Sequence, residues 1–557
     1  LTQEEIASVY AETHACAIPV VHHYEISHDG QGLTCDAETV TIRACANASC
    51  SSLSAQATSL NVLANGVIVG SPTFVGSTTL TFNNTDVETV TMSINNPSIT
   101  ASNPTVCDDG NGASCDIVFA DAGFRFLSGT ANSTSIPNQT SGLVFADALK
   151  VQAVENTDGV CTGIFSGNRA IDLAQENVNP GGTTGLSFNV DSTSIAKHSG
   201  STNITLNFDA DSIATIPNPV YLDAGQIRLR ANYSVGGVNL SGSSNAFWVS
   251  PANLVISAQS GGNNLNGASA SASITHPAGD NFDFIVTAYN GASTPQVTQN
   301  YSPGQLQLRL SRTGPTLSVS ENGRLTYASS GSLVSSVAAN FEDVTLTNFV
   351  SGVSSFAGAR YSEVGLVNVD LQDRNYGNIG ITVPANAINI GRFVPAYFTQ
   401  TVVDNGSLVV NYASGTDFTA YIGQMDESDN TVGAISYLSK PTFAITAYNR
   451  QGDVTRNYYQ DSEGSANDFM TLTGASVSVS LPTADQTALG VDSSALPLNA
   501  SMSTGILSQN DLTVLPTVTA LPKGVLHYQL ADTDHFVYPR NANSQIAPFT
   551  SDLDFTI

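Results

Sequence analysis

The stretch Phe284-Ile285-Val286-Thr287-Ala288-Tyr289-Asn290 alternates apolar side chains with other residues and ends in a turn residue. Phe443-Ala444-Ile445-Thr446-Ala447-Tyr448-Asn449 repeats it closely. Two more triplets share the pattern apolar-x-apolar-x-Ala, namely Val40-Ile42-Ala44 and Leu149-Val151-Ala153. Because successive side chains of a β-strand point to opposite faces, each triplet predicts a strand with one buried face. Four copies of one strand predict four copies of one domain.

A second motif, aromatic-x-acid-x-Gly, follows three of the four triplets. Its copies are Phe119-Ala120-Asp121-Ala122-Gly123, Tyr221-Leu222-Asp223-Ala224-Gly225 and Tyr361-Ser362-Glu363-Val364-Gly365. The glycine lies 79, 72 and 77 residues after the triplet alanine (Ala44 to Gly123, Ala153 to Gly225 and Ala288 to Gly365). In immunoglobulin-like sandwiches a corner of this kind leads into strand F. We therefore predict it at the far end of the first three domains.

Short runs of Val, Ile, Thr and Phe between Gly, Asn, Ser and Pro turns fill the rest of the chain. Helical patterns are confined to residues 1–10 and one turn at 171–175. The sequence predicts an all-β protein, a linear tandem array of about four immunoglobulin-like antiparallel β-sandwich domains. The predicted domains are 20–127, 128–249, 250–394 and 395–557, the last with a truncation or an insertion. The single tryptophan, Trp248, falls at a junction and predicts an anchor between neighbouring domains.

The charge balance excludes several classes of partner. The chain has 557 residues, of which 18 are basic and 46 acidic, for a net charge of −28. Nucleic acids and anionic membrane surfaces are bound through clustered Lys and Arg, so neither is an expected partner. No apolar run reaches the roughly 18 residues of a membrane-spanning helix. We expect both ends to be cuts within a longer protein.

Seven cysteines lie within the first 161 residues: Cys16, Cys35, Cys45, Cys50, Cys107, Cys115 and Cys161. Zinc sites favour closely spaced cysteine pairs with a second pair of ligands. The pairs Cys45–Cys50 and Cys107–Cys115 are wider, and His22, His23 and His28 do not supply the complement. Disulfides formed in an oxidising compartment are therefore favoured over zinc. The predicted bridges are Cys45–Cys50, Cys107–Cys115 and Cys16–Cys35, which leaves Cys161 over.

No catalytic motif occurs in the sequence, so we expect no enzyme activity and no catalytic residues. Two distant carboxylates could still converge as in a polysaccharide hydrolase, which stays a remote alternative. The best candidate for a cation site is the loop with Asp108, Asp109 and Asn111, between Cys107 and Cys115. It lacks the EF-hand spacing, so a disulfide-closed hairpin tip is favoured and Ca²⁺ is the alternative. No other cofactor is expected.

Several stretches resemble a known family. His22-His23-Tyr24-Glu25-Ile26-Ser27-His28, with Leu33-Thr34-Cys35 and the run from Val40 to Cys50, resembles the C-terminal region of the MshQ family. These are biogenesis proteins of the mannose-sensitive haemagglutinin (MSHA) type IV pilus of aquatic Gram-negative bacteria. Phe119 to Phe126 and Gly391 to Pro395 are similar as well. Upstream, residues 1–19 resemble the closing segment of a laminin-G-like domain.

The resemblance implies a protein that is exported through the periplasm to the cell surface. The expected function is that of an adhesin stalk or tip module of an MSHA-type pilus. A pilus assembly factor that binds pilins is the alternative. Expected partners are pilin or other pilus components, and surface glycans through the upstream domain. The family offers no catalytic or binding residues to transfer to this sequence.

Overall fold

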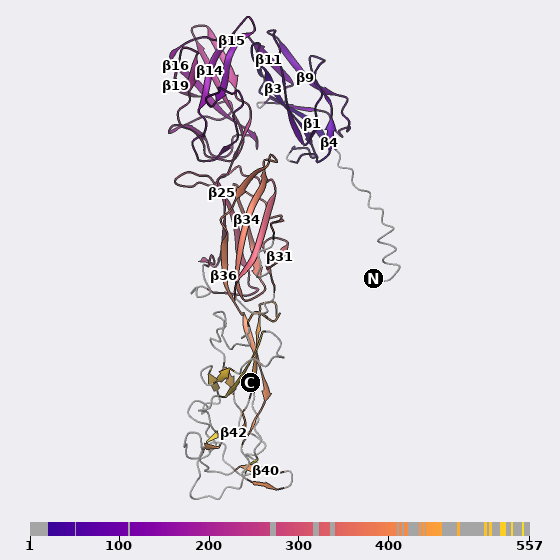
Figure 1. Cartoon of the computed structure of the whole chain (residues 1–557), viewed down its shortest axis with the longest axis vertical. Coiled ribbons are helices and arrows are strands. Elements are labelled where there is room, and N and C mark those ends of the chain that lie inside the picture. The colour runs from indigo at the N-terminus through magenta and orange to yellow at the C-terminus, as the bar shows by residue number, and fades with distance from the viewer. Residues whose placement is uncertain are drawn as a thin grey trace, which may run out of the picture.

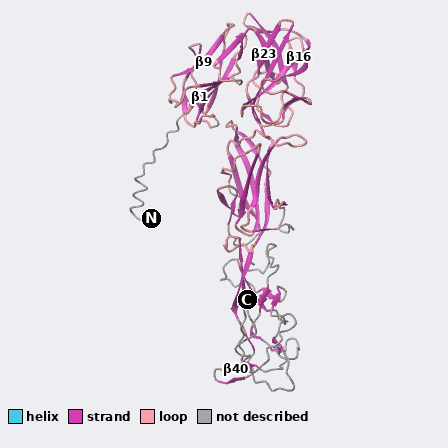
Figure 2. Ribbon diagram, turned by 180° about the vertical axis from the view of Figure 1, so that it is seen from behind, coloured by secondary structure: helices cyan, strands magenta, loops and turns pink. Residues whose placement is uncertain are grey.

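A computed structural model describes residues 21–408 except 51, 110–111, 268–274, 316–321 and 335–339. Beyond residue 408 it describes 412–414, 417–420, 434–435, 437–440, 442–458, 476–478, 506–508, 512–514, 524–530, 536–537 and 549–550. All regular elements of this part are β-strands (Figure 2), which confirms the all-β prediction. The helical turn predicted at 171–175 is wrong, because these residues lie inside strand β16 (Gly167–Asn179). The helix predicted in residues 1–10 falls outside the described residues.

Domain 1 packs two sheets around Val40, Ile42 and Ile117, which are fully buried. The first sheet has the order β10 (Val106–Asp108), β1 (His23–Ser27), β3 (Glu38–Cys45) and β8 (Ser77–Phe82). The second has the order β2 (Gln31–Leu33), β11 (Asp116–Ala120), β9 (Thr89–Asn95), β5 (Asn61–Ala64) and β6 (Val67–Gly70). A separate pair consists of β4 (Ala57–Ser59) and β7 (Thr73–Val75).

Domain 2 begins with β12 (Ala122–Ser128), which pairs with β14 (Leu149–Thr157). Its first sheet also holds β15 (Val160–Gly163) and β20 (Ile213–Thr215). The second sheet has the order β13 (Gln139–Thr140), β24 (Phe247–Ser250), β22 (Gly225–Val235), β16 and β19 (Thr202–Phe208), and β23 (Val238–Ser243) also pairs with β22. A small third sheet holds β18 (Thr193–Ser194), β17 (Phe188–Val190) and β21 (Pro219–Tyr221). The predicted boundary after residue 127 is therefore wrong, because β12 belongs to domain 2.

Domain 3 has the strand order of an immunoglobulin-like sandwich, in which sheet A-B-E-D faces sheet G-F-C. Its first sheet is β26 (Asn263–Asn264), β25 (Asn253–Ser260), β28 (Phe282–Tyr289), β33 (Val353–Tyr361), β30 (Gly323–Thr326) and β31 (Gly331–Val334). Its second is β27 (His276–Pro277), β36 (Ile388–Val394), β34 (Gly365–Tyr376), β29 (Leu306–Gly314) and β32 (Glu342–Asp343), with β35 (Ile381–Pro384) on β34. Strands β25 to β36 lie within the predicted range 250–394.

Domain 4 is described in part. Its main sheet has the order β37 (Tyr397–Asp404), β43 (Thr442–Tyr448), β47 (Val525–Leu530) and β46 (Leu512–Val514). Smaller sheets join β38 (Ser407–Leu408) to β42 (Tyr437–Ser439), β39 (Tyr412–Ser414) to β40 (Asp417–Ala420) and β49 (Phe549–Thr550), β41 (Ala434–Ile435) to β48 (Phe536–Val537), and β44 (Ser476–Ser478) to β45 (Ile506–Ser508).

The four triplet strands are equivalent, as the sequence predicted. Strands β3, β14, β28 and β43 each pair with the strand that opens the domain and, on the other side, with a later strand. The triplet alanine faces an aromatic or leucine residue of the opening strand in every copy: Ala44 with Tyr24, Ala153 with Phe124, Ala288 with Leu254 and Ala447 with Phe398. The central triplet residues Ile42, Val151, Val286 and Ile445 are all 0% exposed.

The domains do not form a single line. Domain 1 lies beside domain 2, whereas domain 3 follows domain 2 along the long axis of the molecule (Figure 1). The sheet of β37 and β43 continues the row beyond domain 3 (Figure 1). The expectation of a linear array is therefore wrong for domain 1, whereas domains 2 and 3 and the sheet of β37 and β43 lie in a row (Figure 1).

Candidate functional site

Three disulfides tie the N-terminal part of the chain together. Cys45 is bonded to Cys50 and Cys107 to Cys115, the two short-range pairs that the sequence predicted. Their Cα atoms lie 4.8 and 5.1 Å apart, inside the range of about 4.4–6.8 Å that such bonds need. The third bond joins Cys35 of domain 1 to Cys161 of domain 2, with a Cα separation of 5.1 Å.

The Cys35–Cys161 bond corrects the predicted pair Cys16–Cys35 and accounts for Cys161, which was expected to be left over. These two cysteines are 126 residues apart in sequence. They meet because domain 1 lies beside domain 2, which brings β15 next to the turn after β2. The sequence around either cysteine does not indicate that the two domains lie side by side. Cys16 lies outside the described residues.

A small hydrogen-bond network accompanies this bond where the chain passes from domain 1 to domain 2. The Thr34 hydroxyl donates to the Asp121 carboxylate at 2.7 Å. The Asn156 amide donates to the Thr34 hydroxyl oxygen at 2.8 Å, and the Asn156 backbone N–H donates to the Asp121 carbonyl at 2.7 Å. The disulfide and these bonds clamp domain 1 against domain 2.

Charged side chains extend the contact between the two domains. Arg43 of domain 1 pairs with Glu25 at 2.7 Å and donates to Gln226 of domain 2 at 2.9 Å. Arg228 of domain 2 donates to the His28 carbonyl at 2.7 Å. These bonds join the outer face of β1 and β3 to strand β22. The contact between domains 1 and 2 is therefore polar, and its hydrogen bonds join particular residues of the two domains.

Glu176 is fully buried behind this interface. Its carboxylate lies 3.2 Å from Arg230 and 3.6 Å from Arg228. Burial raises the pKa of Glu176 to about 7, because desolvation outweighs the pull of the two guanidinium groups. The carboxyl group thus lies buried between two guanidinium groups of strand β22.

The joint between domains 2 and 3 is built on the acid of the second corner motif. The Asp223 carboxylate accepts the backbone N–H groups of Leu186 at 2.6 Å, Ala224 at 2.8 Å and Asn300 at 2.9 Å. Asn300 belongs to domain 3. In return, the Asn290 amide of domain 3 donates to the Leu222 carbonyl at 2.9 Å. Burial raises the pKa of Asp223, and the three N–H bonds oppose that rise.

The joint between domains 3 and 4 repeats the same bonds. The Glu363 carboxylate accepts the backbone N–H groups of Arg456 at 2.8 Å and Asn457 at 3.1 Å. The Asn449 amide donates to the Ser362 carbonyl at 3.1 Å. Asn449 is 1% exposed and Asn457 is fully buried. One set of contacts therefore joins two successive pairs of domains.

Glycines allow the backbones to approach at both joints. Gly142 has φ +77° and Gly279 has φ +83°, and each donates its N–H to the carbonyl of the corner aromatic residue, Tyr221 or Tyr361. A Cβ atom at Gly142 would lie 2.6 Å from the backbone N of Ala292. At Gly279 a Cβ atom would lie 2.9 Å from the backbone N of the next domain's Arg450. Only glycine fits such a contact.

Trp248 packs domain 2 against domain 3, as predicted. Its ring centroid is 5.4 Å from that of Tyr376 in domain 3. The Tyr376 hydroxyl donates to the Val249 carbonyl of domain 2 at 3.3 Å. Ala224 of the corner is part of the buried core of domain 3. Apolar burial thus reinforces the hydrogen bonds of this joint.

The first corner motif does not form such a joint, which corrects the prediction for domain 1. Phe119 lies in β11, the last strand of domain 1, and Gly123 lies in β12 of domain 2. Strand β9 takes the place in domain 1 that β22 and β34 take in domains 2 and 3. Domain 1 has fewer residues than domains 2 and 3. Its link to domain 2 therefore lies about as many residues after Ala44 as the corner motif lies after the triplet alanine in the two longer domains.

The residues singled out for Ca²⁺ are only partly placed. Asp108 lies in β10, where its carbonyl accepts the His28 N–H, and Asp109 follows it. Asn111 lies outside the described residues, so this cation site stays a prediction.

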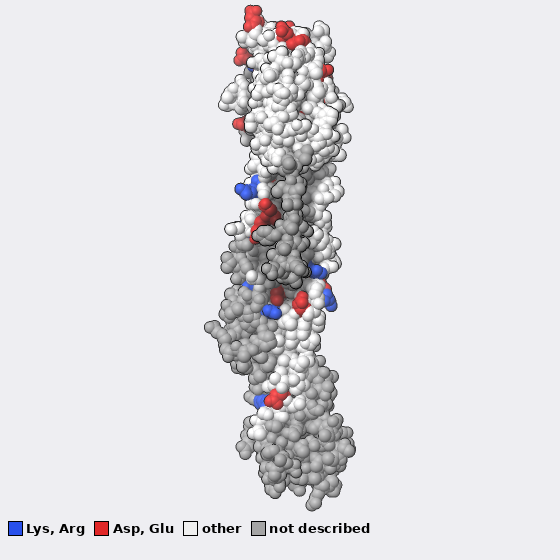
Figure 3. Space-filling view, turned by 90° about the vertical axis from the view of Figure 1, so that its right-hand side faces the viewer, with Lys and Arg blue, Asp and Glu red and all other residues white. Residues whose placement is uncertain are grey.

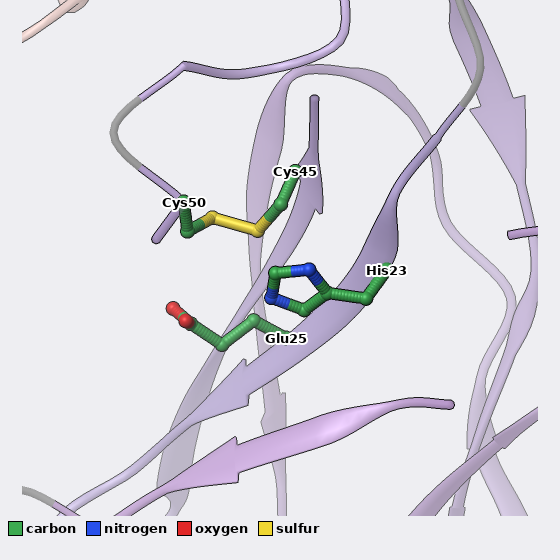
Figure 4. A group of neighbouring side chains, drawn as sticks. All are labelled: His23, Glu25, Cys45 and Cys50. Atoms are coloured by element: carbon green, nitrogen blue, oxygen red, sulfur yellow. A yellow bond between two sulfur atoms is a disulfide. The ribbon is translucent and has the colours of Figure 1, made fainter. Parts of the chain in front are cut away.

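Among the described residues a different group could hold a metal ion (Figure 4). It consists of His23, Glu25, Cys45 and Cys50, whose donor atoms all lie within 4.8 Å of one another. His23 and Glu25 come from β1 and Cys45 from β3, and Cys50 is brought over by the following turn. The sequence argument dismissed His23 as a zinc ligand, because pairing across two strands cannot be read from spacing along the chain.

The described part of the chain contains no helix that could cross a membrane. In this view the charged side chains at the end formed by domains 1 and 2 are mostly Asp and Glu, whereas Lys and Arg appear beside acids further along the molecule (Figure 3).

Comparison with protein families gives four matches. Residues 21–103 match DUF8613, a domain of unknown function. Residues 104–243 match the first Ig-like domain of DUF6701, a domain of unknown function. Residues 250–348 match the second DUF6701 domain, and 363–557 match the third. These matches support the tandem Ig-like organisation, whereas the assignment to the MshQ family stays a prediction.

Solved structures resemble the chain weakly. The three N-terminal domains of the bacteriophage RB49 Highly Immunogenic Outer Capsid protein are 10% identical, with a TM-score of 0.18, over 67% of this chain and 97% of that one. The C-terminal domain of the Streptococcus agalactiae AgI/II polypeptide BspA is 13% identical, with a TM-score of 0.17, over 48% of this chain and 99% of that one. Such scores carry no argument about function. No curated protein matches the chain.

Proposed function

We propose that the chain is the stalk of a pilus-associated adhesin on the cell surface, with domains 1 and 2 toward its outer end. The observation that carries this proposal is the repeated joint, in which Asp223 accepts one backbone N–H of the following domain and Glu363 accepts two. A stalk has to hold its domains at fixed angles over a long reach. Buried hydrogen bonds at each joint serve that purpose better than flexible linkers do.

The disulfides fit the same proposal. Bonds such as Cys35–Cys161 persist in the periplasm and outside the cell, where thiols are oxidised. This bond crosses from domain 1 to domain 2, so it fixes the pair as one broad module. A pilus of the MSHA type is the proposed setting because of the resemblance of residues 22–50 to the MshQ family. Pilin or another pilus component would be the partner at the base, and surface glycans would be bound through an upstream domain.

An assembly factor that binds pilins is the second candidate, and one feature favours it. Strand β6 pairs only with β5 among the described strands, so its other edge is open. Its Val67 and Ile68 side chains are 67% and 54% exposed. An open edge with apolar side chains is suited to adding a strand from another protein.

Immuno-gold labelling of intact cells, combined with pilus counts in a strain that lacks the gene, separates these functions. The stalk proposal expects label along or at the tips of filaments, with pili still made and attachment lost. Loss of all pili, with label confined to the cell envelope, would favour the assembly factor. Hydrolysis of a surface glycan by the purified chain would support the remote enzyme alternative and contradict both.

A further inference from the structure

We propose that the chain binds one zinc ion through His23, Glu25, Cys45 and Cys50 when the Cys45–Cys50 bond is reduced. The four residues lie on the outer face of the first sheet of domain 1. In the pairing of β1 with β3, His23 stands directly opposite Cys45. Glu25 is two residues further along β1, so its side chain points to the same face as His23. Figure 4 shows the Cys45–Cys50 disulfide with the His23 ring and the Glu25 side chain beside it.

The Cys45 and Cys50 sulfur atoms are bonded to each other and must move apart on reduction before they can bind zinc. Zinc bonds of about 2.0–2.3 Å in a tetrahedron place ligand atoms roughly 3.3–3.8 Å apart. The donor atoms here lie within 4.8 Å of one another, so shifts on the order of 1 Å would complete the shell. Four residues separate Cys45 from Cys50, the widest spacing that structural zinc sites use. This spacing counted against zinc in the sequence, but the pairing of β1 with β3 supplies His23 and Glu25 as the second pair of ligands.

The neighbours of these residues also suit a metal. His23 is largely buried on this face, so its ring is held in place beside the two cysteines. His23 Nδ1 lies 2.9 Å from His22 Nδ1, which orients the ring and leaves Nε2 as the ligand atom. Arg43 pairs with Glu25 Oε1 at 2.7 Å, which leaves Oε2 as the ligand atom and offsets the excess negative charge of two thiolates and a carboxylate.

The chemical step is a thiol–disulfide exchange followed by metal binding. A dithiol reductant supplies two electrons to the Cys45–Cys50 bond and becomes a disulfide itself, and the two Sγ atoms take up its two protons. Zn²⁺ then displaces both thiol protons to solvent. The ion would close the turn from Cys45 to Cys50 in a newly exported chain, and the disulfide would close the same turn after oxidation.

The test is a titration of the full chain, reduced with a phosphine, with Co²⁺ as a spectroscopic substitute for Zn²⁺. The expected result is one equivalent bound, with thiolate-to-cobalt charge-transfer absorption, and Zn²⁺ displacing it. The double variant C107S/C115S is the matched control, because it removes a disulfide but keeps the four ligands, and it should bind as the wild type does. C45S/C50S should lose the absorption. H23Q should weaken binding by at least about tenfold, the loss that follows even from changes outside the ligand shell.

A second readout covers the case in which a variant folds poorly. Zn²⁺ should protect Cys45 and Cys50 of the reduced wild type from alkylation, as read by mass spectrometry, and leave Cys107 and Cys115 reactive. Far-UV circular dichroism of oxidised H23Q checks that this variant folds. Equal metal binding by C45S/C50S or H23Q and the wild type would overturn the proposal. The proposal would also be overturned if Zn²⁺ did not selectively protect Cys45 and Cys50 of the reduced wild type from alkylation, whether that protein is folded or not.

Discussion

The Asp223 carboxylate of domain 2 accepts the backbone N–H of Asn300 in domain 3 at 2.9 Å. Both groups are largely removed from water, since Asp223 is 0% and Asn300 is 8% exposed. Glu363 and Asn457 repeat the relationship one domain later. An acid at the end of one domain thus completes the turn that follows the triplet strand of the next.

Replacing Asp223 by Asn should loosen the joint between domains 2 and 3. The amide nitrogen of Asn cannot accept an N–H, so at least one buried donor loses its partner, at a cost of about 1–3 kcal/mol. Hydrogen–deuterium exchange should then speed up by about ten- to a hundredfold at Leu186, Ala224 and Asn300. Glu155→Gln, at an exposed position, is the control and should leave these amides unchanged. If these amides exchange as slowly in D223N as in the wild type, the proposed role of the Asp223 carboxylate is wrong.

Gly142→Ala should disrupt the same joint from the opposite side. The new methyl group would lie 2.6 Å from the Ala292 backbone nitrogen, at φ +77°. Gly159→Ala is a matched control, since Gly159 has φ +82° and no atom within 4 Å of the new position. Both variants carry the cost of a left-handed alanine, roughly 1 kcal/mol, and only G142A adds a clash. Thermal unfolding should therefore drop further for G142A. Equal losses would show that the contact does not matter.

Peptide mapping without reduction should link Cys35 to Cys161. The variant C35S/C161S should release domain 1 from domain 2, so proteolysis at the segment that links them around Asp121, between β11 and β12, should accelerate. The variant C107S/C115S, which opens a loop within domain 1, should leave that segment protected. A Cys16–Cys35 peptide in the map would contradict the arrangement of these two domains.

Domain 1 should lose stability in mild acid through His28. Its Nδ1 accepts the Gly30 N–H at 3.0 Å and its Nε2 donates to the Ser114 carbonyl at 3.1 Å, so a second proton breaks the first bond. Burial lowers the pKa of His28 below its ordinary 6.5. Because the pKa of this base is lower in the folded state, its contribution to the stability of domain 1 is fully present above pH 6.5 and is lost as the pH falls below that value.

The variant H28N tests this pH dependence. Asn keeps an acceptor for Gly30 but does not titrate, and it loses the bond to Ser114. H28N should be less stable than the wild type at pH 8 by about 0.5–1.5 kcal/mol. Denaturant unfolding should show this gap narrowing between pH 7 and pH 5. If the difference in unfolding free energy between H28N and the wild type stays constant with pH, His28 is not the titrating group.

The sequence allowed the strands and the core to be predicted because alternation is a local signal. Val40, Val151, Val286 and Ile445 are buried in equivalent strands for that reason. The repeated Tyr-Asn pairs and the corner acids were also visible as a pattern. Their role was not, because an acid that bonds the next domain's backbone looks in sequence like an acid in its own turn.

Long-range contacts could not be predicted. Cys35 and Cys161 meet only because domain 1 turns back along domain 2, and no spacing rule encodes that turn. The prediction from the first corner motif was wrong for a related reason. Domain 1 is shorter than the others, so the link to domain 2 lies at the distance from the triplet alanine where the corner was expected. His23 and Cys45 became neighbours through strand register, which sequence spacing does not reveal.

Small-angle X-ray scattering of the full chain tests most directly whether domains 2 to 4 form a row with fixed joints. The wild type should give the distance distribution of one elongated particle, the same at low and high salt. The double variant D223A/E363A should give a broader distribution with a more flexible profile. A wild type that already scatters as an ensemble of bent forms, or a double variant that is indistinguishable from it, would contradict the account.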